Sequence, residues 1–187
     1  MNALSLVVIV LLVLLLSIVS YFFLIYNRFQ SLKNAGEATL GQVKVAMKKR
    51  LDMIEQLVES VKSYARFERE TYEKITSLRA SLGKAGAGEL NQIDAASRSL
   101  LGNLLAVAEN YPALKTSETV IVTMTAIKEL EEEIARHRYT YNNIVQNFNT
   151  MLDIVPAKFV GSSIGLKKLD YLEFQEAELR RPAVSWS

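Results

Sequence analysis

Cysteine is absent from this 187-residue sequence, histidine and tryptophan occur once each, and proline occurs three times. Without cysteine the chain can form neither a disulfide framework nor a zinc–thiolate site, and it has no thiol nucleophile. A single histidine cannot supply the paired Glu-x-x-His motifs of a di-metal helical bundle. The 50% hydrophobic content excludes a disordered chain, and the length has room for one domain.

Charge is missing from the first 27 residues, where the stretch from Ala3 to Tyr26 is almost wholly Leu, Val, Ile and Phe. About 20 apolar residues suffice to cross a hydrocarbon core. A cleavable signal peptide is the rival interpretation, but it needs a basic start, a shorter apolar run and a small-residue cleavage site. The sequence therefore predicts an uncleaved transmembrane anchor over residues 1–27. The predicted membrane-interface anchors are Tyr21, Phe22, Phe23, Tyr26 and Arg28.

Basic residues follow this segment, beginning with Arg28 and Lys33, and the acidic Glu37 stands alone among them up to residue 50. By the positive-inside rule we expect the N-terminus outside and the bulk of the chain in the cytoplasm, on the cytoplasmic membrane or an internal one. The whole chain carries 22 basic and 20 acidic residues. Such a balance lacks the basic excess of nucleic-acid-binding proteins, so no nucleic-acid partner is expected.

Apolar residues beyond the anchor recur at helical spacing, and no stretch alternates with a period of two. A glycine-rich run at 83–88, Pro112 and Pro156 mark the breaks, and 157–165 is expected to be a loop. The predicted helices cover residues 28–82, 89–110, 117–155 and 166–180. We expect an all-α fold, in which an N-terminal transmembrane helix continues into an antiparallel bundle of three to four long helices over residues 28–187.

The first predicted helix would be about 80 Å long, against about 58 Å for the third, at 1.5 Å rise per residue. Its membrane-proximal apolar stripe would then lie beyond the bundle, and exposed apolar stripes mark interaction sites. We therefore predict homo-oligomerisation there, with a partner protein, or the loop and helix after Pro156, as the other ways to cover the stripe. A solvated face is the alternative for the basic cluster within this stripe. The candidate contact residues are Leu40, Met47, Lys48, Lys49, Arg50 and Leu51.

No motif predicts catalysis, so neither enzyme activity nor a cofactor is expected. His137 follows Glu133 by one helical turn and is interpreted as an exposed pair rather than a metal site. A Gly-x-Ser-x-Gly elbow is missing, and no Gly-Lys-Ser/Thr follows the glycine run. Asparagine is disfavoured inside helices, and three asparagines directly follow an aromatic residue. We predict polar contacts between helices, with a ligand site as the alternative, at Asn27, Tyr141, Asn142 and Asn149.

Several motifs, taken together, resemble the LemA family. They are Met47-Lys48-Lys49-Arg50-Leu51-Asp52-Met53-Ile54, the run from Leu57 to Ala65, the run from Leu101 to Lys115, and the doublets Tyr141-Asn142 and Phe148-Asn149. The resemblance covers nearly the whole chain. It implies a single N-terminal membrane helix and a largely α-helical bundle, without an established general activity. Some relatives belong to internal or specialised bacterial membranes.

Two functional hypotheses follow. The first is a non-enzymatic, single-pass membrane protein that self-assembles through its helical rods and acts as a membrane scaffold or organiser. The alternative is a regulatory or signal-transducing membrane protein whose helical domain binds a partner protein. The expected partners are membrane lipid, further copies of the chain and, under the alternative, that partner protein.

Overall fold

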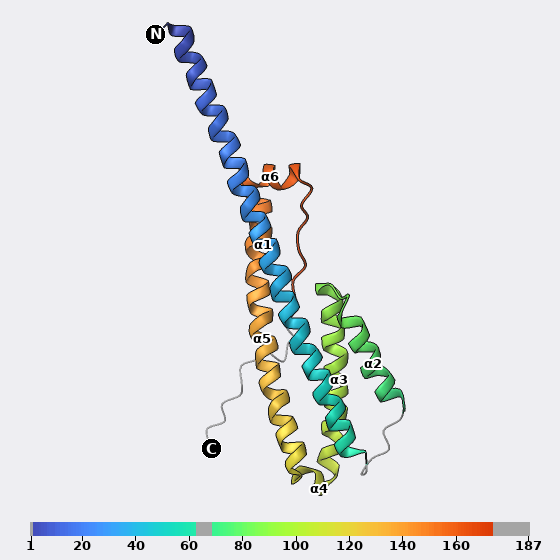
Figure 1. Cartoon of the computed structure of the whole chain (residues 1–187). Coiled ribbons are helices and arrows are strands. Elements are labelled where there is room, and N and C mark those ends of the chain that lie inside the picture. The colour runs from blue at the N-terminus through green and yellow to red at the C-terminus, as the bar shows by residue number, and fades with distance from the viewer. Residues whose placement is uncertain (1, 63–68, 174–187) are drawn as a thin grey trace. The chain divides into compact units, whose positions relative to one another are not determined.

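The computed structural model describes residues 2–62 and 69–173, and it has no β-strand within them. The prediction of an all-α fold is confirmed. Figure 1 shows the helices, which are α1 Ala3–Val61, α2 Arg69–Leu82, α3 Ala87–Asn110, α4 Pro112–Lys115, α5 Glu118–Asp153 and α6 Ala157–Ser163.

Helix α1 runs without a break from the apolar segment through Gly36 and Gly41. The expected single helix over 28–82 is nevertheless wrong, because α1 ends at Val61 and α2 begins at Arg69. Within the predicted helix, residues 63–68 lie outside the described residues. Further on, Tyr111 is extended, as expected for a residue that precedes a proline, and α3 ends at Asn110.

The prediction for residues 157–180 is also wrong where the structure describes it. Residues 157–163 form α6 instead of a loop, and residues 166–173 are not helical. The amide of Asn149 explains the extended backbone, since its Oδ1 accepts from the Leu169 N–H and its Nδ2 donates to the Leu169 carbonyl, both at 2.9 Å. A side chain thus satisfies backbone groups that a helix would pair internally. The remainder, 174–180, lies outside the described residues.

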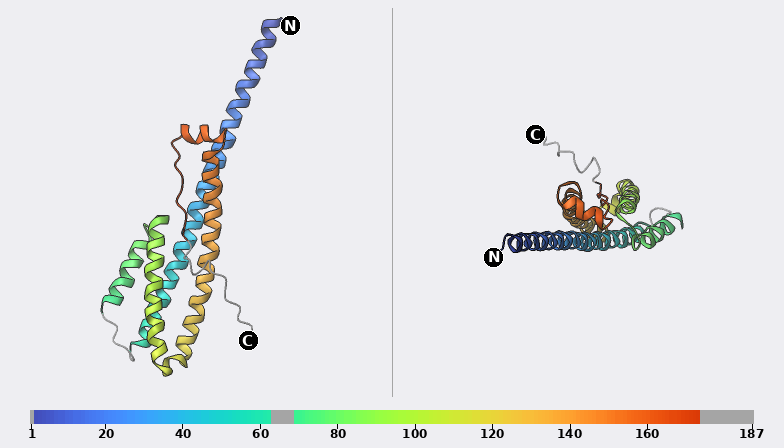
Figure 2. Two further views of the ribbon diagram at one scale, coloured as in Figure 1. Left: turned by 180° about the vertical axis from the view of Figure 1, so that it is seen from behind. Right: turned by 90° about the horizontal axis from the view of Figure 1, so that it is seen from above.

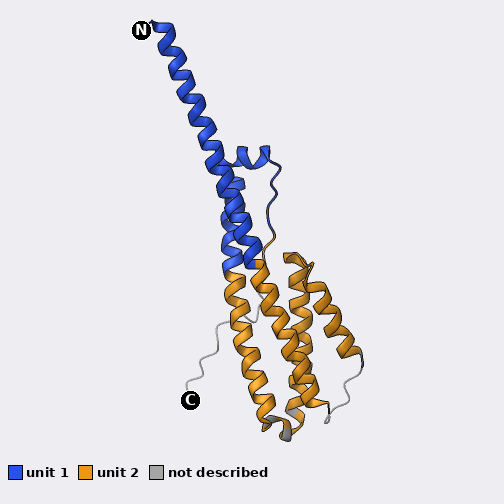
Figure 3. Cartoon of the chain, in the orientation of Figure 1, with its two compact units in different colours: residues 1–39, 140–169 blue, residues 40–139, 170–187 orange. Residues whose placement is uncertain are grey.

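The chain divides into two compact units, shown in Figure 3. Unit 1 comprises Met1–Thr39 and Thr140–Leu169, and unit 2 comprises Leu40–Tyr139 and Asp170–Ser187. The predicted boundary at residue 27 concerns the membrane rather than compactness, and it stays a prediction.

Unit 1 packs the first part of α1 against the end of α5 and against α6. Phe29, fully buried, meets Phe148 edge to face with ring centroids 5.5 Å apart, and Met151 and Ala157 complete the cluster. Both Figure 1 and the left view of Figure 2 show α6 crosswise to α1 and α5. Seven residues alone do not form a stable helix. The packing of α6 against α1 therefore stabilises it.

Unit 2 contains the rest of α1, α2, α3, α4 and the first part of α5, with successive long helices running in opposite directions (Figure 1). The α2 side chain Arg79 binds two carboxylates of α1, Asp52 at 2.6 Å and Glu55 at 2.7 Å. The largest fully buried apolar side chains of unit 2 are Met47, Leu51, Ile54, Leu57, Ile75, Leu90, Leu104, Leu114 and Ile134.

Candidate functional site

The first part of α1 exposes its apolar side chains along the whole predicted anchor. Leu4, Leu12 and Leu16 are 77%, 53% and 64% exposed, and none of the segment's most apolar window is buried. Among the described residues, α1 alone has the length and apolar composition to cross a membrane. A surface this apolar is unfavourable in water, so its exposure supports the membrane interpretation.

The predicted membrane-interface residues lie at the end of this segment. Tyr21, Phe23 and Arg28 are exposed, while Phe22 and Tyr26 are half-buried. Their membrane role stays a prediction. Asn27 is exposed, which is unlike the buried polar contact expected of it.

Arg50 is fully buried, which contradicts its prediction as a surface contact. In unit 2 its guanidinium donates to Asp94 of α3 at 2.6 Å, to Glu131 of α5 at 2.8 Å, and to the Ser97 hydroxyl. Arg138 of α5, also buried, donates to Asp94 at 2.9 Å. These charged side chains form one cluster that joins three helices.

Arg98, on α3, completes this charge cluster. It contacts Asp94 at 3.1 Å and Glu131 at 3.0 Å and is 24% exposed. Three arginines therefore share two carboxylates, and Asp94 contacts all three arginines. The site holds both carboxylates in ion pairs with arginines, an arrangement that links the helices.

The pKa of the Asp94 carboxyl reflects two opposed effects. Burial raises the pKa of Asp94, but the charges of Arg50, Arg138 and Arg98 together lower it below its ordinary value. Because the folded-state pKa lies below that of the unfolded chain, Asp94 stabilises the fold above about pH 4 and loses this contribution as the pH falls through the folded-state value.

Acid should therefore destabilise the protein partly through Asp94. We expect the free energy of unfolding to decrease as the pH is lowered from about 4. The decrease should be less steep in an Asp94→Asn variant, which has no carboxyl to protonate at this position. Denaturant titrations of the full chain in mild detergent, followed by circular dichroism from neutral to acid pH, measure this slope. Asp153→Asn is the control, because that carboxylate is exposed and pairs with an exposed lysine, Lys168. An Asp94→Asn slope equal to that of the unaltered chain would contradict the linkage.

The charge cluster was missed by sequence reasoning, although a signal was present. Arg50 lies three residues after Met47 and four before Ile54, which places it on the buried face of α1. Arg138 likewise stands between Ile134 and Tyr141 on the buried face of α5. A charge at a core position predicts a buried partner, but nothing in the spacing identifies Asp94 as that partner.

Burial removes three of the six residues predicted to form an oligomer or partner contact. Met47, Arg50 and Leu51 are buried within unit 2 and cannot contact a partner, because α3 and α5 cover this part of α1. Leu40 is half-buried, whereas Lys48 and Lys49 are exposed. The apolar side chain that remains exposed in this stretch is Val45, at 57%. The interaction role of the exposed residues stays a prediction.

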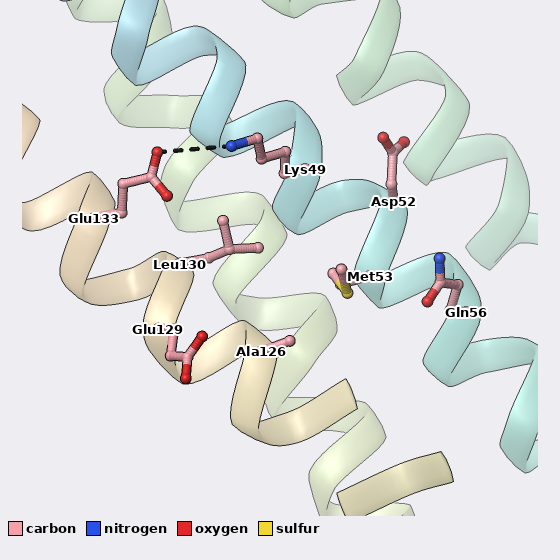
Figure 4. Close-up of a pocket in the computed structure, with 8 residues that line it drawn as sticks. All are labelled: Lys49, Asp52, Met53, Gln56, Ala126, Glu129, Leu130 and Glu133. Carbon is pink, nitrogen blue, oxygen red and sulfur yellow. Dashed lines mark ion pairs between the residues drawn. The ribbon is translucent and has the colours of Figure 1, made fainter. Parts of the chain in front are cut away.

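A groove of about 430 Å³ opens between α1 and α5 in unit 2 (Figure 4). Carboxylates outnumber cations in its lining, and Lys49 faces Glu133 across it at 3.8 Å. An acidic lining around apolar side chains suits a basic amphipathic helix. The lining residues are Lys49, Asp52, Met53, Gln56, Ala126, Glu129, Leu130 and Glu133.

The predicted aromatic–asparagine contacts have mixed outcomes. Tyr141 and Asn149 are buried and Asn142 is half-buried. Asn149 binds the extended segment at Leu169 rather than another helix. His137 lies 3.7 Å from Glu133, and the described residues contain no group of three or more His, Cys, Asp or Glu side chains that could hold a metal ion.

Comparison with known proteins adds a family and relatives. A family model described as LemA family matches residues 39–186. Protein LemA of Metamycoplasma hominis is 27% identical over 90% of this chain and 79% of its own length. Magnetosome protein MamQ 2 of Paramagnetospirillum magneticum is 24% identical over 81% of this chain. The chain spans 65% of the length of that magnetosome protein.

Proposed function

Because this chain belongs to the LemA family, we propose that it is a non-enzymatic, single-pass membrane protein that self-assembles and acts as a membrane scaffold or organiser. One observation carries this proposal: a charge-free helical segment, exposed along its length, continues without a break into helices of a packed bundle. A lipid bilayer removes the apolar side chains of such a segment from water, and the helix satisfies its own backbone hydrogen bonds there.

A non-enzymatic role is supported by the state of the charged groups. The buried carboxylate Asp94 is bound by three arginines, which keep it ionised and weakly basic. The single histidine lies next to a glutamate on a helix surface. The names of the relatives, LemA and MamQ, are not names of enzymes.

Self-assembly is supported by the apolar side chains that the long helices leave exposed. In unit 2 these include Val45 of α1 and Ile121 and Val122 of α5, each more than half exposed. The name magnetosome protein, carried by three of the relatives, associates LemA-like chains with a defined cellular structure. Exposed apolar surface on long helices is suited to pairing with further copies.

The acidic groove of unit 2 favours a second function, that of a regulator that binds a partner protein. A basic amphipathic helix would place apolar side chains against Met53, Ala126 and Leu130 and its cations beside the glutamates. Such a partner would bind more weakly at high salt.

The size of the full-length protein in mild detergent tests both functions. A scaffold runs as a large, defined particle that contains this chain alone, and Val45→Glu reduces that size because a charge replaces an exposed apolar contact. Thr76→Glu, also at an exposed position but on α2, is the control and leaves the size unchanged. A bare monomer at micromolar concentration contradicts self-assembly, and a one-to-one complex with a second protein supports the regulator.

The proposed orientation places the bulk of the chain in the cytoplasm, since Arg28 and Lys33 directly follow the apolar segment. Protease added to intact cells should therefore leave the helical bundle uncut. Cleavage of the bundle from outside would reverse this orientation.

A further inference from the structure

The corner where α5 meets α6 exposes three large apolar side chains within six residues. Ile154, Val155 and Phe159 are 51%, 67% and 68% exposed. All belong to unit 1, the unit that contains the predicted anchor. A cluster of this kind on a protein surface marks a contact with another apolar phase or molecule.

The opposite face of α6 fixes this corner against α1. Ala157, Val160 and Gly161 are buried. A Cβ atom on Gly161 would lie 2.5 Å from a Leu152 methyl of α5 and 3.2 Å from the Phe29 ring of α1, so glycine allows the backbone of α6 to pack closely against both helices, most closely against α5. The exposed side chains are thus carried by a segment whose position beside Phe29 is set by packing.

The level of Phe29 along α1 indicates where the corner lies relative to a bilayer. Phe29 follows Tyr26, the last residue of the apolar segment, by three positions, which is about 4.5 Å along a helix axis. The polar interfacial region outside the hydrocarbon core is roughly 5–7 Å thick on each side. Figures 1 and 2 show α6 crosswise to α1, at the end of α5 nearest the apolar segment. The corner therefore stands at headgroup depth.

The charges near the corner complement an anionic surface. Lys158, within α6, and Lys167, after it, are both exposed. Lys168 is also exposed but pairs with Asp153 at 2.8 Å. Basic residues flanking exposed apolar ones are typical of segments that lie in the interface of an anionic membrane.

We propose that the α5–α6 corner, residues 154–159, is a second membrane contact, which inserts Ile154, Val155 and Phe159 into the headgroup boundary of an anionic phospholipid bilayer while Lys158 and Lys167 bind lipid phosphates. The inference rests on the proposed anchor, because α1 brings the corner to the bilayer. With two contacts, the helix of the anchor is fixed in tilt and rotation as well as in depth.

Site-directed fluorescence tests this contact, since the chain has no cysteine and each introduced one is unique. Full-length Phe159→Cys protein carries an environment-sensitive NBD label and is reconstituted in vesicles of phosphatidylcholine and phosphatidylglycerol. Quenching is measured with lipids spin-labelled near the headgroup and with aqueous iodide. The matched control is Asn143→Cys, an exposed position of α5 in the same unit, about 15 Å before the end of α5.

We expect lipid quenching at residue 159 to exceed that at residue 143 several-fold, and iodide quenching to be several-fold weaker. Equal behaviour at the two positions overturns the inference. Protection from both quenchers at residue 159 also overturns it, in favour of a protein contact. Leu14→Cys reports the anchor itself and is tested with lipids spin-labelled deep in the acyl chain, because residue 14 would lie near the middle of the bilayer. Acyl-chain quenching at Leu14 without headgroup-lipid quenching at residue 159 rejects only the corner, whereas the absence of acyl-chain quenching at Leu14 rejects the proposed anchor.

Discussion

Replacing Asp94 with alanine is expected to lower the free energy of unfolding of unit 2 by about 3–5 kcal/mol, the cost of leaving buried charges without their partner. Asp94 binds three arginines, of which Arg50 and Arg138 are almost completely buried. In its absence all three arginines lose the carboxylate that they share. Amide hydrogen exchange of the full chain in detergent measures the effect, as lost protection in α3 and in the α5 residues of unit 2.

Arg98→Ala is the control for this experiment. Arg98 contacts the same two carboxylates but is partly exposed, and its removal leaves two arginines for two carboxylates. We expect a loss of about 1 kcal/mol or less, because a partly hydrated pair contributes little. Equal losses for Asp94→Ala and Arg98→Ala would show that the excess of buried positive charge does not determine the effect.

The second large effect is expected for Phe29→Ala, which should lower the free energy of unfolding of unit 1 by about 3–5 kcal/mol. The ring of Phe29 is fully buried, packs on Phe148 and lies beside Gly161. Its removal leaves a cavity that α6 cannot fill without moving. Hydrogen exchange should therefore accelerate in α6 and in the last turns of α5.

Phe159→Ala is the matched control, because it removes the same side chain from an exposed position of α6. In detergent it should change stability by no more than about 0.5 kcal/mol, as is usual for surface substitutions. A loss as large as that of Phe29→Ala would mean that Phe159 packs within the protein.

The long helices could be predicted because their apolar periodicity extends over many turns and their ends carry clear signals. Helix α3 follows a glycine-rich run and stops before Pro112, and α5 stops before Pro156. Helix α6 could not be predicted, since seven residues show no repeated pattern and the helix depends on contact with Phe29. The extended segment after α6 depends on the Asn149 amide, which lies 20 residues away from Leu169.

Of the candidate functional regions, the apolar segment could be predicted from the sequence and the charge cluster could not. The apolar segment is continuous in sequence, so composition alone identifies it. The charge cluster joins residues 44 positions apart, from Arg50 to Asp94 and from Asp94 to Arg138. In the sequence Arg50 stands beside Lys48 and Lys49, and the three together suggested an intermolecular contact, with a solvated face as the alternative. The helical spacing places Arg50 on the buried face of α1 and its two neighbours on the exposed face. Which residue Arg50 binds depends on how α1, α3 and α5 pack together.

The same cluster fixes the axial register of the helices in unit 2. If α5 slid by one turn, Ile134 would occupy the place of Arg138 and Ile127 that of Glu131. Isoleucine would fit the apolar packing at either setting, but Asp94 and Arg50 would each lose a charged partner. Apolar side chains alone would tolerate several alignments of these helices, and the buried charges select one of them.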